Sequence, residues 1–356
     1  MVFPHFESIA CRSRRLGRAN GFDGLRLMLA LAIVAVHGVT LTAGDASGMA
    51  WPFRSAAGLV LPAFFALSGY LVAASLMRCA DTRAFLLLRL LRIVPALAAT
   101  VAATALLLGP LMTVLPLTDY FASPVTAAYL QNIIGLPHFL LPGLFEANPR
   151  AGIVNGSLWT IQMEMGCYLA LALLALLARG RLFGIALVGL ALMLLFPRLP
   201  FIGLALAWLP AKPLVLAFVC GALLHRCAAR VPLHPVLGVA ALAGALWIMR
   251  DPADAGLAVP ILAYGVIWLG LRRIPAALTR ADYSYGLYLT AYPVQQAAIQ
   301  FVPGQSWGVN MALALPVAFL AATALWHGVE RPLMARKHEI VARLTGRPLG
   351  LRWARA

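Results

Sequence analysis

Long apolar stretches alternate with short polar segments along almost the whole chain. A helix needs roughly 20 apolar residues to cross the hydrocarbon core of a bilayer. The residue-by-residue alternation typical of a transmembrane β-barrel is absent. We therefore expect an all-α polytopic membrane protein, with 200–209 as half of a broken helix or an eleventh element. About ten transmembrane helices are predicted, at 23–43, 57–77, 86–112, 157–178, 182–197, 212–228, 235–249, 256–271, 284–301 and 308–329.

The composition agrees with this pattern. Of the 356 residues 62% are hydrophobic and 11% are charged, whereas about a quarter of a soluble domain is charged. The first residues are mixed and basic, with no apolar core of a signal peptide, so the first span is expected to serve as its own insertion signal. We expect a basic N-terminal segment at 1–22, a transmembrane domain at 23–330 and a basic tail at 331–356.

The net charge of +16 is distributed unevenly between the two sides of the predicted membrane. With ten spans and both termini on one side, 23 of the 28 Lys and Arg residues lie on that side and five on the other. Cytoplasmic loops carry such an excess, so both termini are predicted to be cytoplasmic. The surplus charge then faces anionic lipid headgroups, and no nucleic-acid partner is expected.

The five cysteines form no metal-type pair with a histidine. They lie in or near the predicted spans or on the predicted cytoplasmic side, which gives no disulfide framework. The sequence therefore predicts neither a bound metal nor structural disulfides.

His37 is an ionisable residue inside the first apolar stretch. Such residues are costly in a membrane and normally face the bundle interior, which makes each one a functional candidate. His37 follows Asp23 by fourteen residues, or roughly 21 Å of helix, so it should lie in the outer third of the membrane. Arg26 falls on nearly the same helix face, so one stripe of this span can line a passage from the cytoplasm to the imidazole.

A second polar group is predicted to enter the membrane from outside, in the segment NGSLWTIQMEMGCYL (155–169). Glu164 lies seven residues past Ser157, roughly 10 Å deep and close to the predicted depth of His37. Ser157, Thr160 and Glu164 share one helix face. A carboxylate beside an imidazole fixes its tautomer, as general-base catalysis needs. The alternative is that the two side chains pair only to lock two helices together.

A pair of arginines lies at the predicted cytoplasmic start of the third span, in RAFLLLRLLRIVP (83–95). Their spacing of three residues puts Arg89 and Arg92 on one helix face, and guanidinium groups bind phosphates bidentately. The alternative is ordinary anchoring by arginines that reach the membrane surface. Phosphate ligands near the inner face and a proton acceptor near the outer face together suggest group transfer across the membrane.

Six motifs between residues 22 and 332 carry a family resemblance. They are FDGLRLMLALAIVAVH (22–37), FFALSGYLV (64–72), LLRLLRIVPAL (87–97), NGSLWTIQMEMGCYL (155–169), DYSYGLYLTAYPVQQ (282–296) and HGVERP (327–332). In their order and spacing the chain resembles the integral-membrane acyltransferase-3 family. That family moves acyl groups, usually acetyl from acetyl-CoA, onto hydroxyls of sugars and other acceptors, often across the bacterial inner membrane.

The resemblance assigns roles to individual residues. It implies that His37 is the catalytic histidine, that Arg89 and Arg92 are the arginine pair credited with CoA binding, and that Glu164 is the acidic residue after the SLWT segment. Other recurrent positions have less defined roles, and these are Asp23, Arg26, Ser68, Gly69, Tyr285, Tyr288 and Glu330. We expect Arg26 to add to the donor site, and the substrate to contact Asp23, Ser157, Trp159 and Tyr288.

Two positions depart from the family pattern. Many relatives carry Asp where this chain has Pro62, and His where it has Ala291. Neither of those side chains can therefore be required for the chemistry of this protein, unless its activity is lost or altered.

The leading hypothesis is a multi-pass O-acyltransferase of the bacterial inner membrane. It takes an acyl group, expected to be acetyl, from cytoplasmic acyl-CoA and transfers it to a hydroxyl of a sugar or glycan, with His37 as general base. The alternative is a proton- or anion-coupled transporter, with His37 and Glu164 as a proton relay and the arginines as an anion gate. Secondary transporters often contain repeats, and no repeat is evident in this chain.

Overall fold

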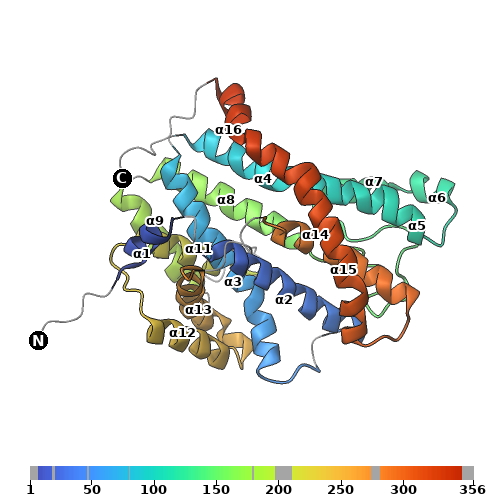
Figure 1. Cartoon of the computed structure of the whole chain (residues 1–356), viewed down its shortest axis with the longest axis horizontal. Helices are drawn as coiled ribbons and strands as arrows, with labels where there is room; N and C mark the ends of the chain where they lie inside the picture. The colour runs from blue at the N-terminus through green and yellow to red at the C-terminus, as the bar shows by residue number, and fades with distance from the viewer. Residues whose placement is uncertain are drawn as a thin grey trace, which may run out of the picture.

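The protein is a helical bundle (Figure 1). The computed structural model describes residues 7–17, 21–45, 48–79, 81–178, 180–196, 211–273 and 281–346. These residues contain two isolated β-bridges and no β-strand. Each of the ten predicted stretches contains a helix, whereas the predicted extra element at 200–209 lies outside the described residues. The helical elements are α1 Ile9–Leu16, α2 Phe22–Ala43, α3 Phe53–Arg78, α4 Thr82–Ala103, η2 Thr104–Leu108, α5 Gly109–Met112, α6 Leu117–Ala122, α7 Pro124–Tyr129, η3 Leu130–Ile134, α8 Trp159–Leu177, α9 Arg181–Leu195, α11 Lys212–Arg226, α12 Pro235–Ile248, η4 Pro252–Asp254, α13 Ala255–Gly270, α14 Ser284–Phe301, α15 Trp307–Leu325, η6 Trp326–Glu330 and α16 Arg331–Thr345.

Six helical segments of the described chain are long and apolar enough to cross a membrane. They are Phe22–Ala43, Phe53–Arg78, Thr82–Met112, Trp159–Leu177, Pro252–Gly270 and Trp307–Thr345. Two further apolar helices, α9 and α12, are shorter. The protein is thus a multi-pass helical membrane protein, and the total of ten spans and the side of the termini stay predictions.

Helix α3 is the most buried of the six candidate spans and packs along α11. The two backbones approach closely at glycines. A Cβ atom on Gly69 would lie 1.9 Å from the carbonyl oxygen of Phe218, and one on Gly221 would lie 2.0 Å from that of Ala66. Small residues allow such contacts between membrane helices. Pro62 is also buried in α3.

Helices α2, α14 and α15 form a second packed group. Its core consists of small and aliphatic side chains, namely Ala30, Val34, Leu287, Ala291, Ala318 and Ala322. Ala291 is therefore a packing residue here, and a histidine at this position would have to displace its neighbours. This group carries α2 past α14 and positions His37 of α2 against the middle of α14.

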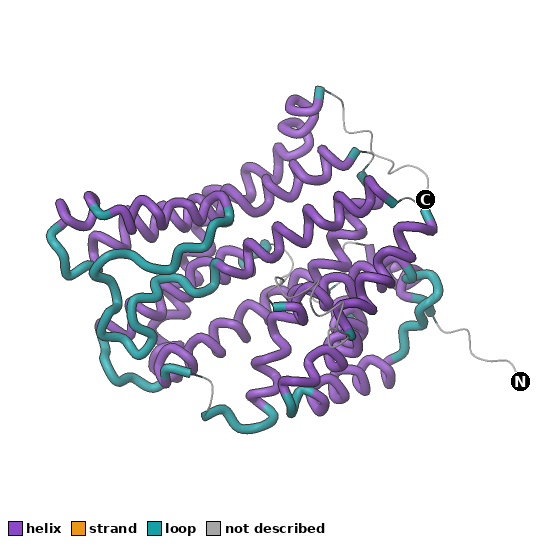
Figure 2. The backbone as a smooth tube through the Cα atoms, turned by 180° about the vertical axis from the view of Figure 1, so that it is seen from behind, coloured by secondary structure: helices purple, strands orange, loops and turns teal. Residues whose placement is uncertain are grey.

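The segment between η3 and α8 contains no helix and is among the loops drawn in teal in Figure 2, and hydrogen bonds attach it to α14. Asn148 donates hydrogen bonds to the backbone and side-chain oxygens of Gln296, and Asn155 donates to the carbonyl of Leu289. Tyr288 donates to the carbonyl of Ser157. The contacts descend α14 from 296 to 288, or about 12 Å. Such backbone is tolerated at membrane depth where protein covers it, and we call 148–158 the re-entrant segment.

Candidate active site

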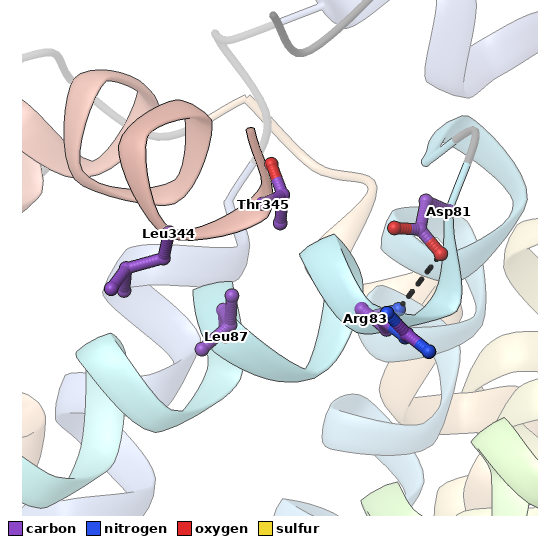
Figure 3. A pocket seen from close by; sticks show the side chains of 5 residues that line it. All are labelled: Asp81, Arg83, Leu87, Leu344 and Thr345. Atoms are coloured by element: carbon purple, nitrogen blue, oxygen red, sulfur yellow. Dashed lines mark hydrogen bonds between the residues drawn. The ribbon is translucent and has the colours of Figure 1, made fainter. Parts of the chain in front are cut away.

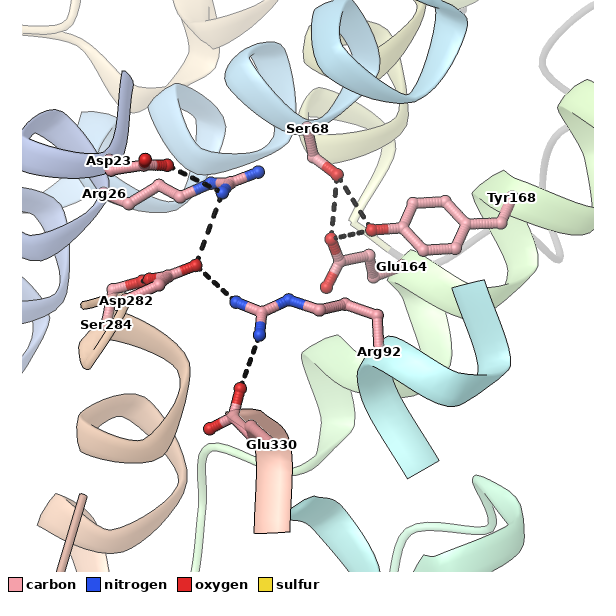
Figure 4. A network of polar contacts seen from close by, with 9 residues as sticks. All are labelled: Asp23, Arg26, Ser68, Arg92, Glu164, Tyr168, Asp282, Ser284 and Glu330. Carbon is pink, nitrogen blue, oxygen red and sulfur yellow. Dashed lines mark hydrogen bonds and ion pairs between the residues drawn. The ribbon is translucent and has the colours of Figure 1, made fainter. Parts of the chain in front are cut away.

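An ion-pair network joins three helices and the residues before a fourth at one end of the bundle (Figure 4). We call this the basic end. There α2 and α4 begin, and α3 ends. Arg92 of α4 donates one hydrogen bond to Asp282 and another, of 2.5 Å, to Glu330. Asp282 also pairs with Arg26 at 3.5 Å, and Arg26 pairs with Asp23 at 3.4 Å. The network therefore links α2, α4, α14 and η6.

Local structure directs these carboxylates inward. Glu330 ends the π-helical turn η6, and such turns frequently occur at functional sites. Its side chain is only 2% exposed. Asp282 precedes α14 and accepts a hydrogen bond from Ser284 at 2.5 Å. Burial raises the pKa of Asp282, but the guanidinium groups of Arg92 and Arg26 outweigh it and hold that pKa below its ordinary value.

The two arginines predicted to bind phosphate have different surroundings. Arg92 is occupied by two carboxylates, whereas Arg89 donates one hydrogen bond of 3.2 Å, to the hydroxyl of Ser75. The Nε atom of Arg89 is buried without a partner among the described residues. Arg92 thus has a structural role here, because its ion pairs link α4 to Asp282 and Glu330. Arg89 keeps an unused N–H donor that can bind an anion. Phosphate binding by either residue stays a prediction.

Glu164 belongs to a separate hydrogen-bonded cluster between α8 and α3 (Figure 4). Its Oε1 atom accepts from the Ser68 hydroxyl at 2.8 Å and from the Tyr168 hydroxyl at 2.5 Å. Within the described chain, Glu164 makes no hydrogen bond or ion pair with His37. The predicted pairing of these two side chains is therefore wrong.

The pairing was predicted wrongly because the membrane depth predicted for Glu164 on α8 was too shallow. Ser68, the partner of Glu164, lies fifteen residues from the start of α3, or about 22 Å along the helix. His37 lies six residues from the end of α2, or about 9 Å along the helix. Only nine residues separate these two helix ends in the chain, so the ends lie near one another and the two side chains lie at different depths. Because the re-entrant segment starts α8 inside the bundle, Glu164 lies deeper than a count from the membrane surface indicates.

His37 packs edge-on against the ring of Tyr292, with centroids 5.0 Å apart and an interplanar angle of 76°. The imidazole is partly exposed, and no described residue hydrogen-bonds to it. On the next residue, Gly38, a Cβ atom would lie 3.3 Å from the side-chain nitrogen of Gln295 and 3.4 Å from Met311. The absence of a side chain at Gly38 thus brings α14 and α15 close to His37.

The residues predicted to contact substrate are divided between different places. Tyr288 meets Ser157 and Thr160 where the re-entrant segment joins α8, which brings two of the predicted residues together. The Ser157 hydroxyl is buried without a partner among the described residues. Trp159 packs against the main hydrophobic core instead, and Asp23 lies in the ion-pair network at the basic end.

Four residues near Arg92, Glu164 and His37 were not assigned a role on the basis of the sequence. Asp282 bridges two arginines, Tyr168 donates to Glu164, Tyr292 contacts the ring of His37, and Gln295 binds the backbone of the turn before His37. One signal was available, because adjacent glutamines in the middle of an apolar helix are unusual and mark candidates for a site. The partners of Arg92 had no local signal, because Asp282 and Glu330 are 190 and 238 residues away in the chain.

A cavity of about 410 Å³ lies at the start of α4, where the end of α16 covers it (Figure 3). Its lining consists of Asp81, Arg83, Leu87, Leu344 and Thr345. Asp81 accepts a hydrogen bond from the backbone of Arg83 and caps α4. The cavity contains none of the predicted site residues, so it is a separate feature of the basic end.

Two curated proteins are similar to the chain over nearly their whole lengths. An "O-acetyl transferase" of Shigella phage Sf6 is 27% identical over 339 residues, which cover 90% of this chain and 97% of that protein. "Nodulation protein 10" of Rhizobium leguminosarum bv. viciae is 28% identical over 372 residues, which cover 92% and 96%. No solved structure matches the chain significantly.

The known family that matches is described as an acyltransferase domain, and the match covers residues 19–327. This range contains α2 with His37, the arginines of α4 and the re-entrant segment. It includes most of the helical bundle. The chain therefore belongs to the acyltransferase-3 family and is a membrane acyltransferase.

Proposed function

We propose that the protein is a transmembrane O-acyltransferase that moves an acyl group from acyl-CoA to a hydroxyl of a sugar or glycan. The observation that carries the proposal is the arrangement of α2. Arg26 lies at the basic end of this helix, and His37 lies eleven residues, or about 16 Å, further along it. The long pantetheine arm of CoA can connect such points. The name of the phage relative supports acetyl as the acyl group.

In the proposed reaction, His37 takes the proton of the acceptor hydroxyl. The hydroxyl oxygen attacks the carbonyl carbon of the thioester, so a C–O bond forms and the C–S bond breaks. The imidazolium then returns the proton to the CoA thiolate. General-base help of this kind contributes about 10² to 10⁴ in rate. The partly exposed imidazole, which has no hydrogen-bond partner among the described residues, supports this role.

The donor phosphates are proposed to bind at the basic end. In the ion-pair network, Arg26 and Arg92 are balanced by Asp23, Asp282 and Glu330. Arg89 has no carboxylate partner among the described residues, so its guanidinium is the best phosphate ligand of the three arginines. Arg26 and Arg92 would join it once a phosphate replaces a carboxylate.

Glu164 is proposed to line the path of the thioester between the arginines and His37, since Figure 4 shows its cluster next to the ion-pair network of Arg92. The acceptor is proposed to enter from the opposite end, past Ser157 and Tyr288. We place the basic end at the cytoplasm of a bacterium, because the excess of Lys and Arg favours that side.

Free thiol release tests the proposal. Purified protein in detergent, given acetyl-CoA and a panel of sugars, is expected to release CoA thiol and to form an acetylated sugar. His37→Ala should abolish both products and keep the elution profile and thermal unfolding of the wild type. Unchanged transfer by that variant would refute the role of His37. Uptake of an anion into vesicles that contain the protein, without thiol release, would favour a transporter.

A further inference from the structure

Gln295 of α14 is a fully buried amide beside the helix turn that precedes His37. Its Nε2 atom donates hydrogen bonds of 3.0 Å to the carbonyl of Val34 and to the side-chain oxygen of Asn310. Asn310 in turn donates to the backbone carbonyl of Gln295. Because both acceptors lie on one side, they fix which end of the amide carries the nitrogen.

The other end of the same amide has no partner. The Oε1 atom of Gln295 is buried and accepts no hydrogen bond from the described residues. The adjacent Gln296 is equally buried, but its side-chain nitrogen donates to Arg150 and Ile153, and its oxygen accepts from Asn148. A buried acceptor without a partner is costly and rare in native proteins, so it calls for an explanation.

His37 is placed to supply that partner. A helical side chain leans toward the N-terminus and covers the preceding turn, so the imidazole lies over the turn that contains Val34. The carbonyl of Val34 is the one that binds Gln295. Tyr292 lies three residues before Gln295 on α14, and its ring centroid lies 5.0 Å from that of the imidazole. Gln295 thus binds the turn that the imidazole covers, about one helical turn along α14 from the tyrosine that contacts the ring.

We propose that Gln295 is a positioning residue, whose Oε1 atom accepts a hydrogen bond from one ring N–H of His37 during the reaction. The ring is held by no other hydrogen bond among the described residues, so it can turn from the face of Tyr292 toward the amide. This contact would leave the second ring nitrogen unprotonated and directed at the acceptor hydroxyl. The inference rests on the proposed general-base role of His37.

An amide suits this task for a physical reason. A carboxylate would fix the tautomer and also favour the imidazolium form, whereas a neutral amide orients the ring without adding a charge. The imidazole then stays in the neutral form that can take a proton. Gln295 thus fills the orienting role that the sequence suggested for Glu164.

Few ionisable groups face His37 in the described structure. From α14 the ring meets Tyr292, beside which lies Arg150 of the re-entrant segment. Helix α15 carries no charged residue, tyrosine or histidine. Helix α3 has Arg54 and Arg78 near its two ends, and its tyrosine Tyr70 packs against His225 rather than His37. A charge introduced at 295 should therefore dominate the titration of the ring.

The test uses Gln295→Glu, Gln295→Met and the control Gln300→Met in the full-length protein. Gln300 is a second amide on α14 whose oxygen has no partner among the described residues, but its nitrogen bonds to Met112 rather than to α2. Diethyl pyrocarbonate modifies neutral imidazole, and mass spectrometry of the peptide that contains His37 measures its rate against pH. Kinetics with acetyl-CoA and sugar acceptors are measured in parallel.

Gln295→Glu is expected to raise the pH of half-maximal modification by about one unit or more, because a carboxylate stabilises the imidazolium. The two methionine variants should leave that pH unchanged. Gln295→Met should lower kcat by about tenfold or more, a share of the rate that general-base help supplies, while the KM for acetyl-CoA stays within about twofold. Gln300→Met should keep the wild-type kcat.

An unchanged titration in Gln295→Glu would overturn the proposal, because the new carboxylate would not contact the ring. A kcat for Gln295→Met within twofold of that for Gln300→Met would also overturn it. If Gln295→Met does not fold, the titration of Gln295→Glu decides alone. If the wild type transfers no acyl group, the proposed function fails, and the labelling still decides whether Gln295 and His37 touch.

Discussion

The ion-pair network at the basic end predicts that Arg92 and Glu330 are coupled in their contributions to the free energy of unfolding. Glu330 is 2% exposed and contacts Arg92 at 2.5 Å, while Arg92 is 23% exposed. Removing one partner of a buried pair costs about 3 to 5 kcal/mol. Because Arg92 keeps Asp282 and reaches some solvent, we expect a cost below that range, about 2 to 3 kcal/mol, for Glu330→Gln.

The assay is a double-mutant cycle of Glu330→Gln and Arg92→Gln, read from reversible unfolding in detergent and SDS mixtures. The double variant should be less destabilised than the sum of the single variants, with a coupling of about 1 to 3 kcal/mol, because it removes the Glu330 charge that Arg92→Gln alone leaves unpaired, while Asp282 keeps Arg26. The matched control is Glu339→Gln, which breaks the exposed Glu339–Arg343 pair on α16 and should leave stability unchanged. If the destabilisation of the two single variants is additive in the double variant, the ion pair between Arg92 and Glu330 does not stabilise the protein.

Two further predictions concern packing and the donor. Gly69→Leu should prevent folding, because a Cβ atom there would lie 1.9 Å from the Phe218 backbone. The control Gly166→Leu, where nothing lies within 4 Å of the added Cβ atom, should express and elute as the wild type does. Equal yields of the two variants would contradict the packing of α3 on α11. Arg89→Ala should weaken acetyl-CoA binding by about 10- to 100-fold, the value of a charge-assisted hydrogen bond of roughly 1.5 to 3 kcal/mol, with Arg89→Lys intermediate. Calorimetry of donor binding checks this, and an unchanged Kd in Arg89→Ala would exclude the guanidinium as a phosphate ligand.

The sequence predicted the helices well, because most apolar stretches end at charged residues, glycine or proline. Helix α2 was predicted at 23–43 and is found at Phe22–Ala43, and α14 was predicted at 284–301 and is found there. The position of His37 along α2 follows from helix geometry alone, as does its distance from Arg26. Such features depend on local patterns, which a single sequence contains.

The site could be predicted only in part, because its depth and partners are set by contacts between distant segments. The depth of Glu164 depends on the bond from Asn155 to Leu289 and on that from Tyr288 to Ser157, which draw the start of α8 into the bundle. No pattern near Glu164 encodes these contacts. The packing of α14 against α2 and α4 likewise brings Asp282 to Arg92 and the Gln295 amide to the turn before His37.

The proposed function requires one donor molecule to reach from Arg89 at the basic end to His37 inside the bundle. A structure of the protein with a non-hydrolysable thioether analogue of acetyl-CoA is the decisive test. We expect phosphate oxygens within hydrogen-bonding distance of the Arg89 guanidinium and the carbon that replaces the thioester carbonyl beside the imidazole of His37. An analogue with its reactive carbon held at Glu164, or with its phosphates away from Arg89, would rule out this arrangement of the donor.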